Sequence, residues 1–282
     1  MKIFEKKNDL KKFLQKFREG KKTIGFVPTM GALHNGHLAL ISRAKKENDI
    51  AVCSIFVNPT QFNNKEDLKK YPRTLKKDIS LLKKQKCDVL FVPDEKEIYP
   101  ENDTSNNLEI DFGSLDKMME GKFRPGHFKG VAIVVNKLFK IAMPHKAYFG
   151  EKDFQQLAII KKMTKNLKHN IDIVSCATVR EKDGLAMSSR NTRLSIQERK
   201  VAPFIYKILK EAKNRVAKFS PYEIKNWAEN QFELNKNFRL EYFEISDAET
   251  LQAIKKWNKK KSAVACVATY LGNVRLIDNI KI

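Results

Sequence analysis

The chain has 282 residues, of which 42% are hydrophobic and 10% aromatic, enough to bury a core in one or two domains and too apolar for a disordered protein. The formal net charge is +22, but 44 of the 55 basic residues are lysines, spread in pairs along the chain rather than gathered in one segment. Proteins that recognise nucleic acids specifically favour arginine for their phosphate and base contacts, so we expect no specific nucleic-acid partner. A bilayer span needs roughly 18 consecutive apolar residues, and no run in the sequence approaches that length, so we expect no membrane partner.

Through the first two-thirds of the chain, short apolar runs alternate with segments that carry apolar residues at helical spacing. The runs predicted as strands are 24–27, 50–57, 89–92, 147–149 and 171–176. The segments predicted as helices between them are 38–46, 75–86, 128–141 and 154–167. Alternating strands and helices predict an α/β fold with a Rossmann-like, doubly wound parallel sheet, whose site lies at the carboxyl ends of the strands.

The pattern changes after about residue 177. Two long helical patterns, 196–218 and 222–234, precede three predicted strands at 240–246, 263–271 and 274–277. This order predicts a smaller α+β domain that closes over the first one. We therefore expect an N-terminal domain over residues 1–177 and a C-terminal lid domain over residues 178–282.

The cysteines indicate the compartment. The four of them lie far apart with no CxxC spacing, and most lie in apolar runs: Cys53, Cys87, Cys176 and Cys266. Such cysteines are predicted to be small buried hydrophobes in a reducing environment. Because the first residues also lack the apolar core of a signal peptide, we expect a cytoplasmic protein.

The first candidate site is the segment TIGFVPTMGALHNGHLAL, residues 23–40, where a predicted strand, a glycine turn and a helix N-terminus follow one another. The first helical N–H groups are expected to be unpaired, and the helix dipole favours a nearby anion there by roughly 0.3–1 kcal/mol. His34 and His37 are three residues apart, so both rings would face the same anion. Two other interpretations stay open: a hydrogen-bonded core pair, and a zinc site, for which the other three histidines show no suitable spacing.

The second candidate site is SIFVNPTQF, residues 54–62. The predicted strand stops at Pro59, so the amides of Asn58 and Gln61 would emerge at the edge of the sheet where ligands bind. Uncharged amides can hold hydroxyl and carboxylate groups without adding charge. The alternative is ordinary turn chemistry, because Asn-Pro also starts turns.

The third candidate site is YFGEKDFQQL, residues 148–157, again a strand end, a glycine and a helix start. Gly150 would allow the backbone to approach a ribose, and Lys152 offers a point charge to phosphates. Asp153 can accept ribose hydroxyls or cap the helix. Gln156 lies one turn inside the helix and would face the same opening.

The fourth candidate site is AMSSRNTRLS, residues 186–195. Two hydroxyls and an arginine in one loop suit a triphosphate, although Ser195 is also a natural helix cap. A further loop, GKFRPGHFKGV over residues 121–131, adds Arg124 and His127 as secondary candidates.

The HxGH pattern of residues 34–37 resembles the signature of the nucleotidylyltransferase-like superfamily, which is related to class I aminoacyl-tRNA synthetases. The longer strings PTMGALHNGHLAL, FVNPTQF, YFGEKDFQQL, MSSRN and VRLIDN resemble more narrowly the pantothenate synthetase (pantoate–β-alanine ligase) family. The matches follow the family's order from residue 28 to about residue 279. The resemblance implies an ATP-dependent condensation of (R)-pantoate with β-alanine through pantoyl adenylate, which releases AMP and diphosphate.

The resemblance also implies roles for particular residues. Catalysis is implied for His34, His37 and Lys152, with His37 as the proton donor. ATP binding is implied for Met30, Gly31, Ala32, Leu33, His34, Asn35, Gly36, His37, Gly150, Glu151, Lys152, Asp153, Val179, Met187, Ser188, Ser189 and Arg190. Pantoate binding is implied for three amides, Asn58, Gln61 and Gln156, and Gln61 also reaches β-alanine.

Mg²⁺ is implied as the companion of ATP, and a homodimer as the assembly. Relatives often carry more than one carboxylate where this chain reads YPRTLKKD, residues 71–78. Asp78 is therefore the one acid of this segment that could lie near Mg²⁺. No residue is therefore assigned as a direct ligand of Mg²⁺, because this ion commonly keeps its waters and binds through phosphates.

Two alternative functions are carried forward. A nucleotidylyltransferase of the same superfamily would transfer AMP to a phosphorylated substrate, and would hold that phosphate with arginine or lysine where this chain has amides. A basic RNA-binding protein with a nucleotide fold would show aromatic residues interleaved with its basic ones, and the sequence shows no clear pattern of that kind.

Overall fold

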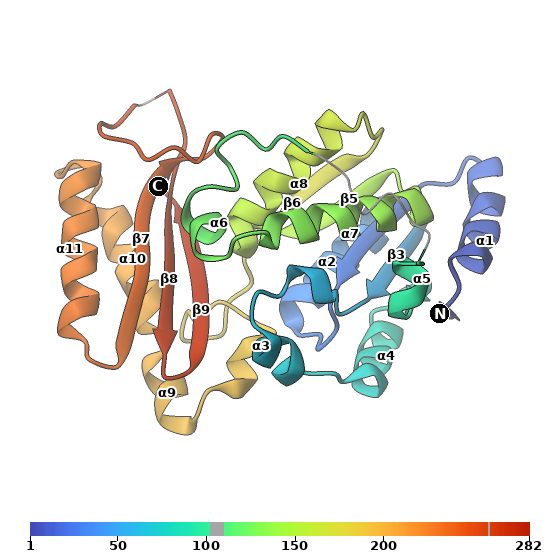
Figure 1. The fold of residues 1–282 in the computed structure, drawn as a ribbon, viewed down its shortest axis with the longest axis horizontal. Helices are drawn as coiled ribbons and strands as arrows, with labels where there is room; N and C mark the ends of the chain where they lie inside the picture. The colour runs from blue at the N-terminus through green and yellow to red at the C-terminus, as the bar shows by residue number, and fades with distance from the viewer. Residues whose placement is uncertain (102–109, 259) are drawn as a thin grey trace.

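The computed structural model describes residues 1–101, 110–258 and 260–282. The described strands form two sheets that lie side by side (Figure 1). The first sheet contains β1 (Lys2–Phe4), β2 (Ile24–Thr29), β3 (Ile50–Ile55), β4 (Val89–Phe91), β5 (Lys146–Gly150) and β6 (Asp172–Cys176). Its order is β1-β4-β3-β2-β5-β6, and every neighbouring pair is parallel. This confirms the predicted doubly wound α/β fold.

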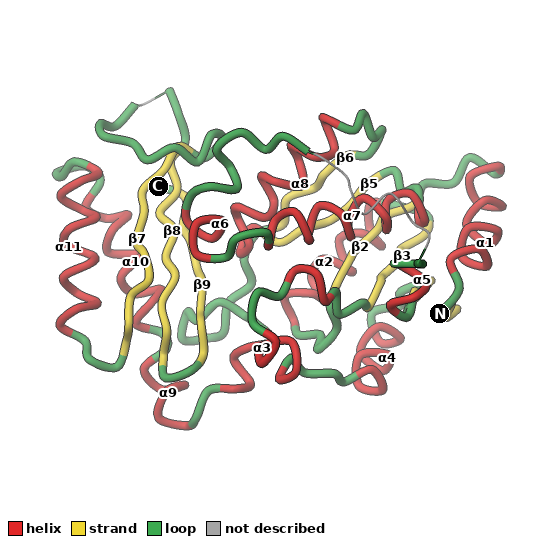
Figure 2. The backbone as a smooth tube through the Cα atoms, viewed as in Figure 1, coloured by secondary structure: helices red, strands yellow, loops and turns green. Residues whose placement is uncertain are grey.

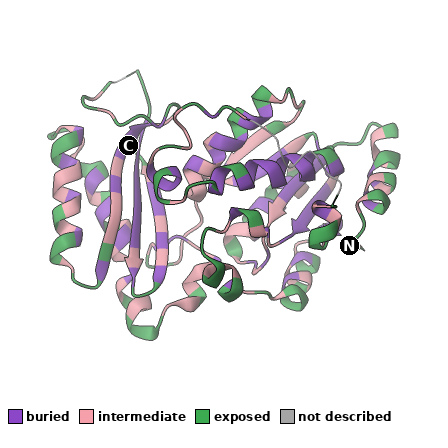
Figure 3. Ribbon diagram, viewed as in Figure 1, coloured by how far each residue is buried: buried purple, intermediate pink, exposed green. Residues whose placement is uncertain are grey.

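Helices cover both faces of the first sheet, as continuous apolar strands require. The helices of ten or more residues in this part of the chain are α1 (Lys7–Glu19), α2 (Asn35–Glu47), α4 (Leu75–Lys84), α7 (His127–Ala142) and α8 (Phe154–Asn166). α1, α7 and α8 share one hydrophobic core with the sheet, whereas α2 and α4 form a second core on the opposite face. Figure 3 shows how completely α7 and the central strands are buried.

Short helical turns connect these elements. They are η1 (Pro59–Gln61), α3 (Lys65–Lys70), α5 (Glu95–Ile98), α6 (Met119–Phe123), η3 (Glu151–Asp153) and η4 (Ser189–Arg193). None of the described helices is long and apolar enough to cross a membrane.

The second sheet is antiparallel and belongs to the C-terminal part of the chain. It consists of β7 (Phe238–Asp247), β8 (Ala263–Leu271) and β9 (Val274–Lys281). Figure 2 shows α10 (Phe204–Arg215) and α11 (Pro221–Leu234) on the side away from the first sheet, where they share a core with β7–β9. The other face of β7–β9 therefore looks towards the N-terminal part. This confirms the smaller α+β unit, and β6 ends one residue before the predicted boundary at 177, which itself stays a prediction.

Two expectations differ from the structure. The helix predicted over residues 196–218 is broken into α9 (Ile196–Val201) and α10, because Pro203 between them has no N–H to continue the helical ladder. The strand β1 was not predicted, since three residues are too few to show a period. Its backbone is nevertheless paired in parallel with β4.

Candidate active site

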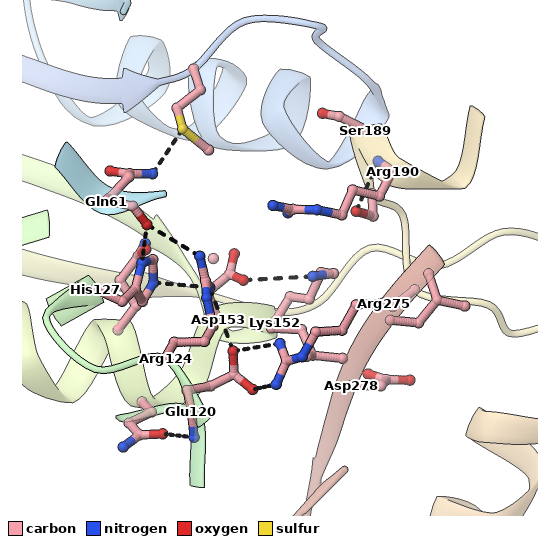
Figure 4. Close-up of a pocket in the computed structure, with 18 of the residues that line it drawn as sticks. Gln61, Glu120, Arg124, His127, Lys152, Asp153, Ser189, Arg190, Arg275 and Asp278 are labelled. Atoms are coloured by element: carbon pink, nitrogen blue, oxygen red, sulfur yellow. Dashed lines mark hydrogen bonds and ion pairs between the residues drawn. The ribbon is translucent and has the colours of Figure 1, made fainter. Parts of the chain in front are cut away.

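A cavity of about 860 Å³ lies between the two parts of the molecule. Its walls come from the segments that follow β2, β3 and β5, from α7 and the start of α8, and from the exposed face of β7–β9. This is the edge where a parallel sheet binds ligands. Figure 4 shows the side chains of Gln61, Lys152 and Arg190 converging on this space from separate segments.

The structure brings most of the predicted site residues to this cavity. Those that line it are Met30, His34, Gly36, His37, Asn58, Gln61, Gly150, Lys152, Asp153, Gln156, Val179, Met187, Ser188, Ser189 and Arg190, together with Arg124 and His127. The predicted residues that lie outside its wall are Gly31, Ala32, Leu33, Asn35, Glu151 and Asp78. Segments far apart in the sequence therefore meet in one space.

His34 and His37 form the start of α2. His34 is the N-cap, and its Nδ1 accepts from the N–H of Gly36 at 3.2 Å, while Nδ1 of His37 accepts from the N–H of His34 at 3.4 Å. The two ring centroids are 4.1 Å apart. Because each Nδ1 is an acceptor, each neutral ring carries its proton on Nε2. Nε2 is therefore the atom that can donate to a ligand.

Burial sets the charge of the two rings. It lowers the pKa of His34 to about 4, with a contribution from the nearby Lys152 cation that exceeds the opposing effect of Asp153. Burial also lowers the pKa of His37 to about 3, helped by His34 and Lys152. Both rings are therefore neutral at pH 7 in this structure, and they are hydrogen-bond donors rather than cations.

The N–H groups of the glycine turn before α2 are paired within the protein. The Asp78 carboxylate of α4 accepts from the N–H of Ala32 at 3.0 Å and of Leu33 at 2.8 Å, and the Thr29 hydroxyl accepts from the N–H of Gly31 at 3.2 Å. Among the first helical N–H groups, which we expected to be unpaired, that of Gly36 is paired with His34 Nδ1. The donors that this segment presents to the cavity are the imidazoles.

Lys152 lies in η3, at the carboxyl end of β5. Its side chain is 17% exposed, and its Nζ is 3.6 Å from Oδ1 of Asp153. Asn279 of β9 fixes the turn from the other side, because its Nδ2 donates to the carbonyl oxygens of Glu151 at 2.9 Å and Lys152 at 2.8 Å. The Glu151 side chain pairs with a lysine of β9 instead of facing the cavity. The second sheet thus helps to position the lysine.

A chain of hydrogen bonds orients the amide of Gln61. The Tyr99 hydroxyl donates to Oδ1 of Asn58 at 2.7 Å, and the Thr60 hydroxyl donates to the same oxygen at 3.1 Å. Asn58 Nδ2 then donates to Oε1 of Gln61 at 3.3 Å and to a carbonyl of α7 at 3.3 Å. Gln61 Nε2 donates to Sδ of Met30 at 2.8 Å. Both ends of the Asn58 amide are engaged, so Asn58 acts on the cavity through Gln61.

The two glutamines at the start of α8 have different environments. Gln155 is buried and accepts from the N–H of Glu120 at 3.0 Å, while its Nε2 donates to the carbonyl oxygens of Leu115 and Met118. Both glutamines line the cavity, but only the Gln155 amide is engaged by these backbone groups of the described residues. The geometry therefore gives Gln155 a structural role and leaves Gln156 to a ligand.

The serine-rich loop is fixed to the glycine turn. Ser188 caps η4, because its Oγ accepts from the N–H of Arg190 at 3.2 Å. The Ser189 hydroxyl donates to the carbonyl oxygen of Ala32 at 3.0 Å. The loop that carries Arg190 is thus held next to the segment that carries the histidines.

Arg190 and Arg193 both pair with one carboxylate that sequence reasoning missed. Nη2 of Arg190 donates to Oδ2 of Asp67 at 2.8 Å, and Nη1 of Arg193 donates to Oδ1 at 2.6 Å. Asp67 comes from α3, and all three residues line the cavity.

The secondary candidates Arg124 and His127 support the backbone of Gln61. His127 Nδ1 donates to the carbonyl oxygen of Gln61 at 2.8 Å, and its Nε2 accepts from Nη1 of Arg124 at 3.1 Å. Burial lowers the pKa of His127 to about 4, and the Arg124 cation adds to this effect. His127 is therefore neutral at pH 7, with both ring nitrogens engaged.

A buried ionic cluster between the two parts of the chain was also missed. Glu120 accepts from Nη1 and Nη2 of Arg275 at 2.8 and 2.6 Å (Figure 4). It also accepts from the Tyr242 hydroxyl at 2.9 Å. Arg275 also pairs with Glu241. Burial raises the pKa of Glu120, but the pairing with Arg275 outweighs burial and holds it at about 2. Single charges 155 residues apart give no local signal in the sequence.

The parallel sheet, the histidine-capped helix and the lysine-bearing turn together define an enzyme of the HxGH nucleotidylyltransferase-like class. The model of the family described as pantoate-beta-alanine ligase matches residues 2–281. The chain belongs to this family, and it is a ligase.

Named relatives agree with the family. The pantothenate synthetases of Porphyromonas gingivalis and Christiangramia forsetii are each 50% identical over 281 residues, covering 100% and 99% of this chain and 99% of each relative. The crystal structure of pantothenate synthetase from Thermus thermophilus matches with a TM-score of 0.91 at 41% identity and covers 99% of both chains. Pantoate-β-alanine ligase from Francisella tularensis, complexed with β-γ ATP and β-alanine, matches with a TM-score of 0.82 at 40% identity, covering 99% of this chain and 97% of that one.

Proposed function

We propose that the cavity binds ATP, pantoate and β-alanine and joins the two acids through pantoyl adenylate. The observation that carries this proposal is the meeting of neutral histidines, a lysine, a serine–arginine loop and two amides in one cavity of about 860 Å³. The Francisella tularensis relative, bound to β-γ ATP and β-alanine, supports the choice of substrates. The family supports the ligation itself.

The nucleotide is proposed to lie between α2, η3 and η4. Nε2 of His34 and of His37 would donate to phosphate oxygens, and Lys152 would add a positive charge. The Ser188–Arg190 loop would bind the β- and γ-phosphates, while Val179 and Gly150 line the part of the cavity assigned to adenosine.

Pantoate is proposed to bind at the amides. Gln61 Nε2 is already turned away from Asn58, so it is oriented as a donor to a carboxylate or hydroxyl oxygen. Gln156 lines the cavity from α8, and Gln61 would also reach β-alanine. Asn58 would contribute by fixing Gln61. The uncharged amides at this end suit a carboxylate or hydroxyl, and the nearby Arg124 is engaged with His127 and Glu120, so a phosphorylated second substrate and the nucleotidylyltransferase alternative are not favoured.

In the first step a pantoate carboxylate oxygen attacks the α-phosphorus, and the bond to the bridging oxygen breaks, so that diphosphate leaves with the electron pair. In the second step the β-alanine amine attacks the acyl carbon, AMP leaves with the electron pair of the acyl–oxygen bond, and the extra proton on the new amide nitrogen passes to water. The protein's task is to position the reactants and stabilise charge on the phosphates. Because the His37 ring is neutral, its Nε2–H is proposed to donate a hydrogen bond to the phosphates rather than a proton, and Lys152 and Arg190 would bind the leaving diphosphate.

Mg²⁺ is proposed to enter as part of the substrate, MgATP. Among the described residues, no group of three or more His, Cys, Asp or Glu side chains is placed to hold a metal ion. Both Asp78 oxygens accept backbone N–H groups outside the cavity wall. We therefore propose that the phosphates of ATP, together with water molecules, hold Mg²⁺ rather than protein side chains, because Mg²⁺ gives up its waters reluctantly.

A cytoplasmic location and a homodimer remain part of the proposal. The location is supported by four buried cysteines, all unpaired in the structure, which suit a reducing compartment. The homodimer rests on the family resemblance, and light scattering of the purified chain would measure it.

The experiment that tests the function is the release of AMP from MgATP with pantoate and β-alanine, against mixtures that omit either acid. We expect AMP to accumulate over many turnovers only when both acids are present. AMP with pantoate alone would indicate that water, not an amine, accepts the acyl group. A folded protein that forms no AMP in any mixture would contradict the proposal.

A further inference from the structure

The pairing of Asp67 with two arginines has the geometry of an anion site that is filled by the protein's own carboxylate. Its two oxygens each receive a guanidinium donor, at 2.8 Å from Arg190 and 2.6 Å from Arg193. Guanidinium forks bind the oxygens of phosphates in the same way. Each of the three side chains is about a quarter exposed, at 26, 25 and 23% for Asp67, Arg190 and Arg193, and all three face the cavity.

The contact joins two segments that are otherwise separate. Asp67 belongs to α3, and the arginines belong to η4, more than 120 residues further along the chain. Burial raises the pKa of Asp67, but the two guanidinium groups outweigh burial and keep it below its usual value. Asp67 is therefore ionised at neutral pH, and it meets an incoming phosphate as a like charge.

We propose that Asp67 is a positioning residue that competes with diphosphate for Arg190 and Arg193, and thereby promotes the release of diphosphate after the first step. This inference rests on the proposed function, in which Arg190 binds the β- and γ-phosphates. While the triphosphate is bound, phosphate oxygens take guanidinium donors from Asp67. When diphosphate leaves, the carboxylate takes these donors back, so the two arginines are never left without an anion.

The proposal makes a prediction of definite sign. Asp67→Asn keeps the shape and one acceptor oxygen but removes the competing charge. Diphosphate should then bind more tightly and leave more slowly. If Asp67 only braced the arginines, the same substitution would loosen them and weaken the binding of diphosphate. The two roles therefore shift the affinity for diphosphate in opposite directions.

The assay is the pantoate-dependent exchange of labelled diphosphate into ATP, measured without β-alanine, which reports the reversible step from ATP and pantoate to pantoyl adenylate and diphosphate. We expect the KM for diphosphate to fall at least fivefold in Asp67→Asn. Glu66→Gln is the matched control, because Glu66 lies on the same helix beside the same cavity but, among the described residues, its carboxylate pairs only with Lys70, at 3.8 Å. We expect less than a twofold change there, since exposed charges are screened.

Each outcome decides between the alternatives. An equal fall in both variants would show a general effect of charge. A higher KM in Asp67→Asn would show a brace, and an unchanged KM would show that Asp67 does not compete with diphosphate; each of these results overturns the proposal. Calorimetric titration with magnesium diphosphate gives the same comparison if a variant no longer catalyses exchange, and tighter binding in Asp67→Asn alone supports competition. A wild-type protein that shows no exchange would contradict the adenylate route itself, and with it this inference.

Discussion

Asp78 stabilises the turn that leads into α2, and we expect its removal to lower the stability of the protein. The side chain is 1% exposed, and it accepts from the N–H groups of Ala32 and Leu33 at 3.0 and 2.8 Å and from the Thr74 hydroxyl at 3.2 Å. In Asp78→Ala the two N–H groups lose their acceptor, which costs about 1–3 kcal/mol for each buried donor. The free energy of unfolding should therefore fall by roughly 2–6 kcal/mol.

The fall should appear as a drop in Tm of roughly 4–24 °C, since a chain of this size shifts by about 2–4 °C per kcal/mol. Asp78→Asn keeps one acceptor but points an amide N–H₂ group at the second donor, so we expect about half that drop. Far-UV circular dichroism is the suitable probe, because both tryptophans, Trp227 and Trp257, lie in the C-terminal part. Asp9→Ala, an exposed acid in the first turn of α1, is the matched control and should cost less than about 1 kcal/mol.

A Tm of Asp78→Ala within about 1 °C of the wild-type value would refute this reasoning. A changed Mg²⁺ dependence of AMP formation without any loss of stability would assign the carboxylate to the cation instead. The two roles that were open for Asp78 are thus separated by one pair of measurements.

Lys152→Ala and His37→Ala should each lose at least roughly tenfold in AMP formation, about 1.4 kcal/mol, while circular dichroism shows an intact fold; wild-type rates would contradict their roles. Tyr99→Phe should raise the KM for pantoate roughly fivefold, about 1 kcal/mol for one hydrogen bond, and an unchanged value would exclude the chain through Asn58. As the pH falls below about 6.5, His37 takes up a proton in the unfolded chain, whereas in the folded protein the half-buried ring stays neutral until about pH 3. This ring alone should lower the free energy of unfolding by about 1.4 kcal/mol for each pH unit in this range. In urea titrations, the free energy of unfolding of His37→Asn should therefore fall less steeply with decreasing pH than that of the wild type.

The sequence by itself determined the elements and the end of the sheet where the site lies. The run 24–27 lies in β2 and the pattern 128–141 lies in α7. Both could be predicted because the spacing of apolar residues within a segment shows which of its faces will be buried. The polar residues that follow the predicted strands reach one cavity, because parallel strands end at one edge of the sheet. His34, Lys152 and Gln156 could therefore be expected at one cavity before any packing was known.

Only the tertiary structure decided which polar groups satisfy one another. The partners of Asp78 lie 46 and 45 residues away, those of Asp67 lie 123 and 126 away, and Glu120 and Arg275 are 155 apart. Such pairs follow from how helices and sheets pack, so no local period reveals them. The same packing partly buries His37 and makes it neutral, because desolvation depends on every segment around the ring rather than on its neighbours in the sequence.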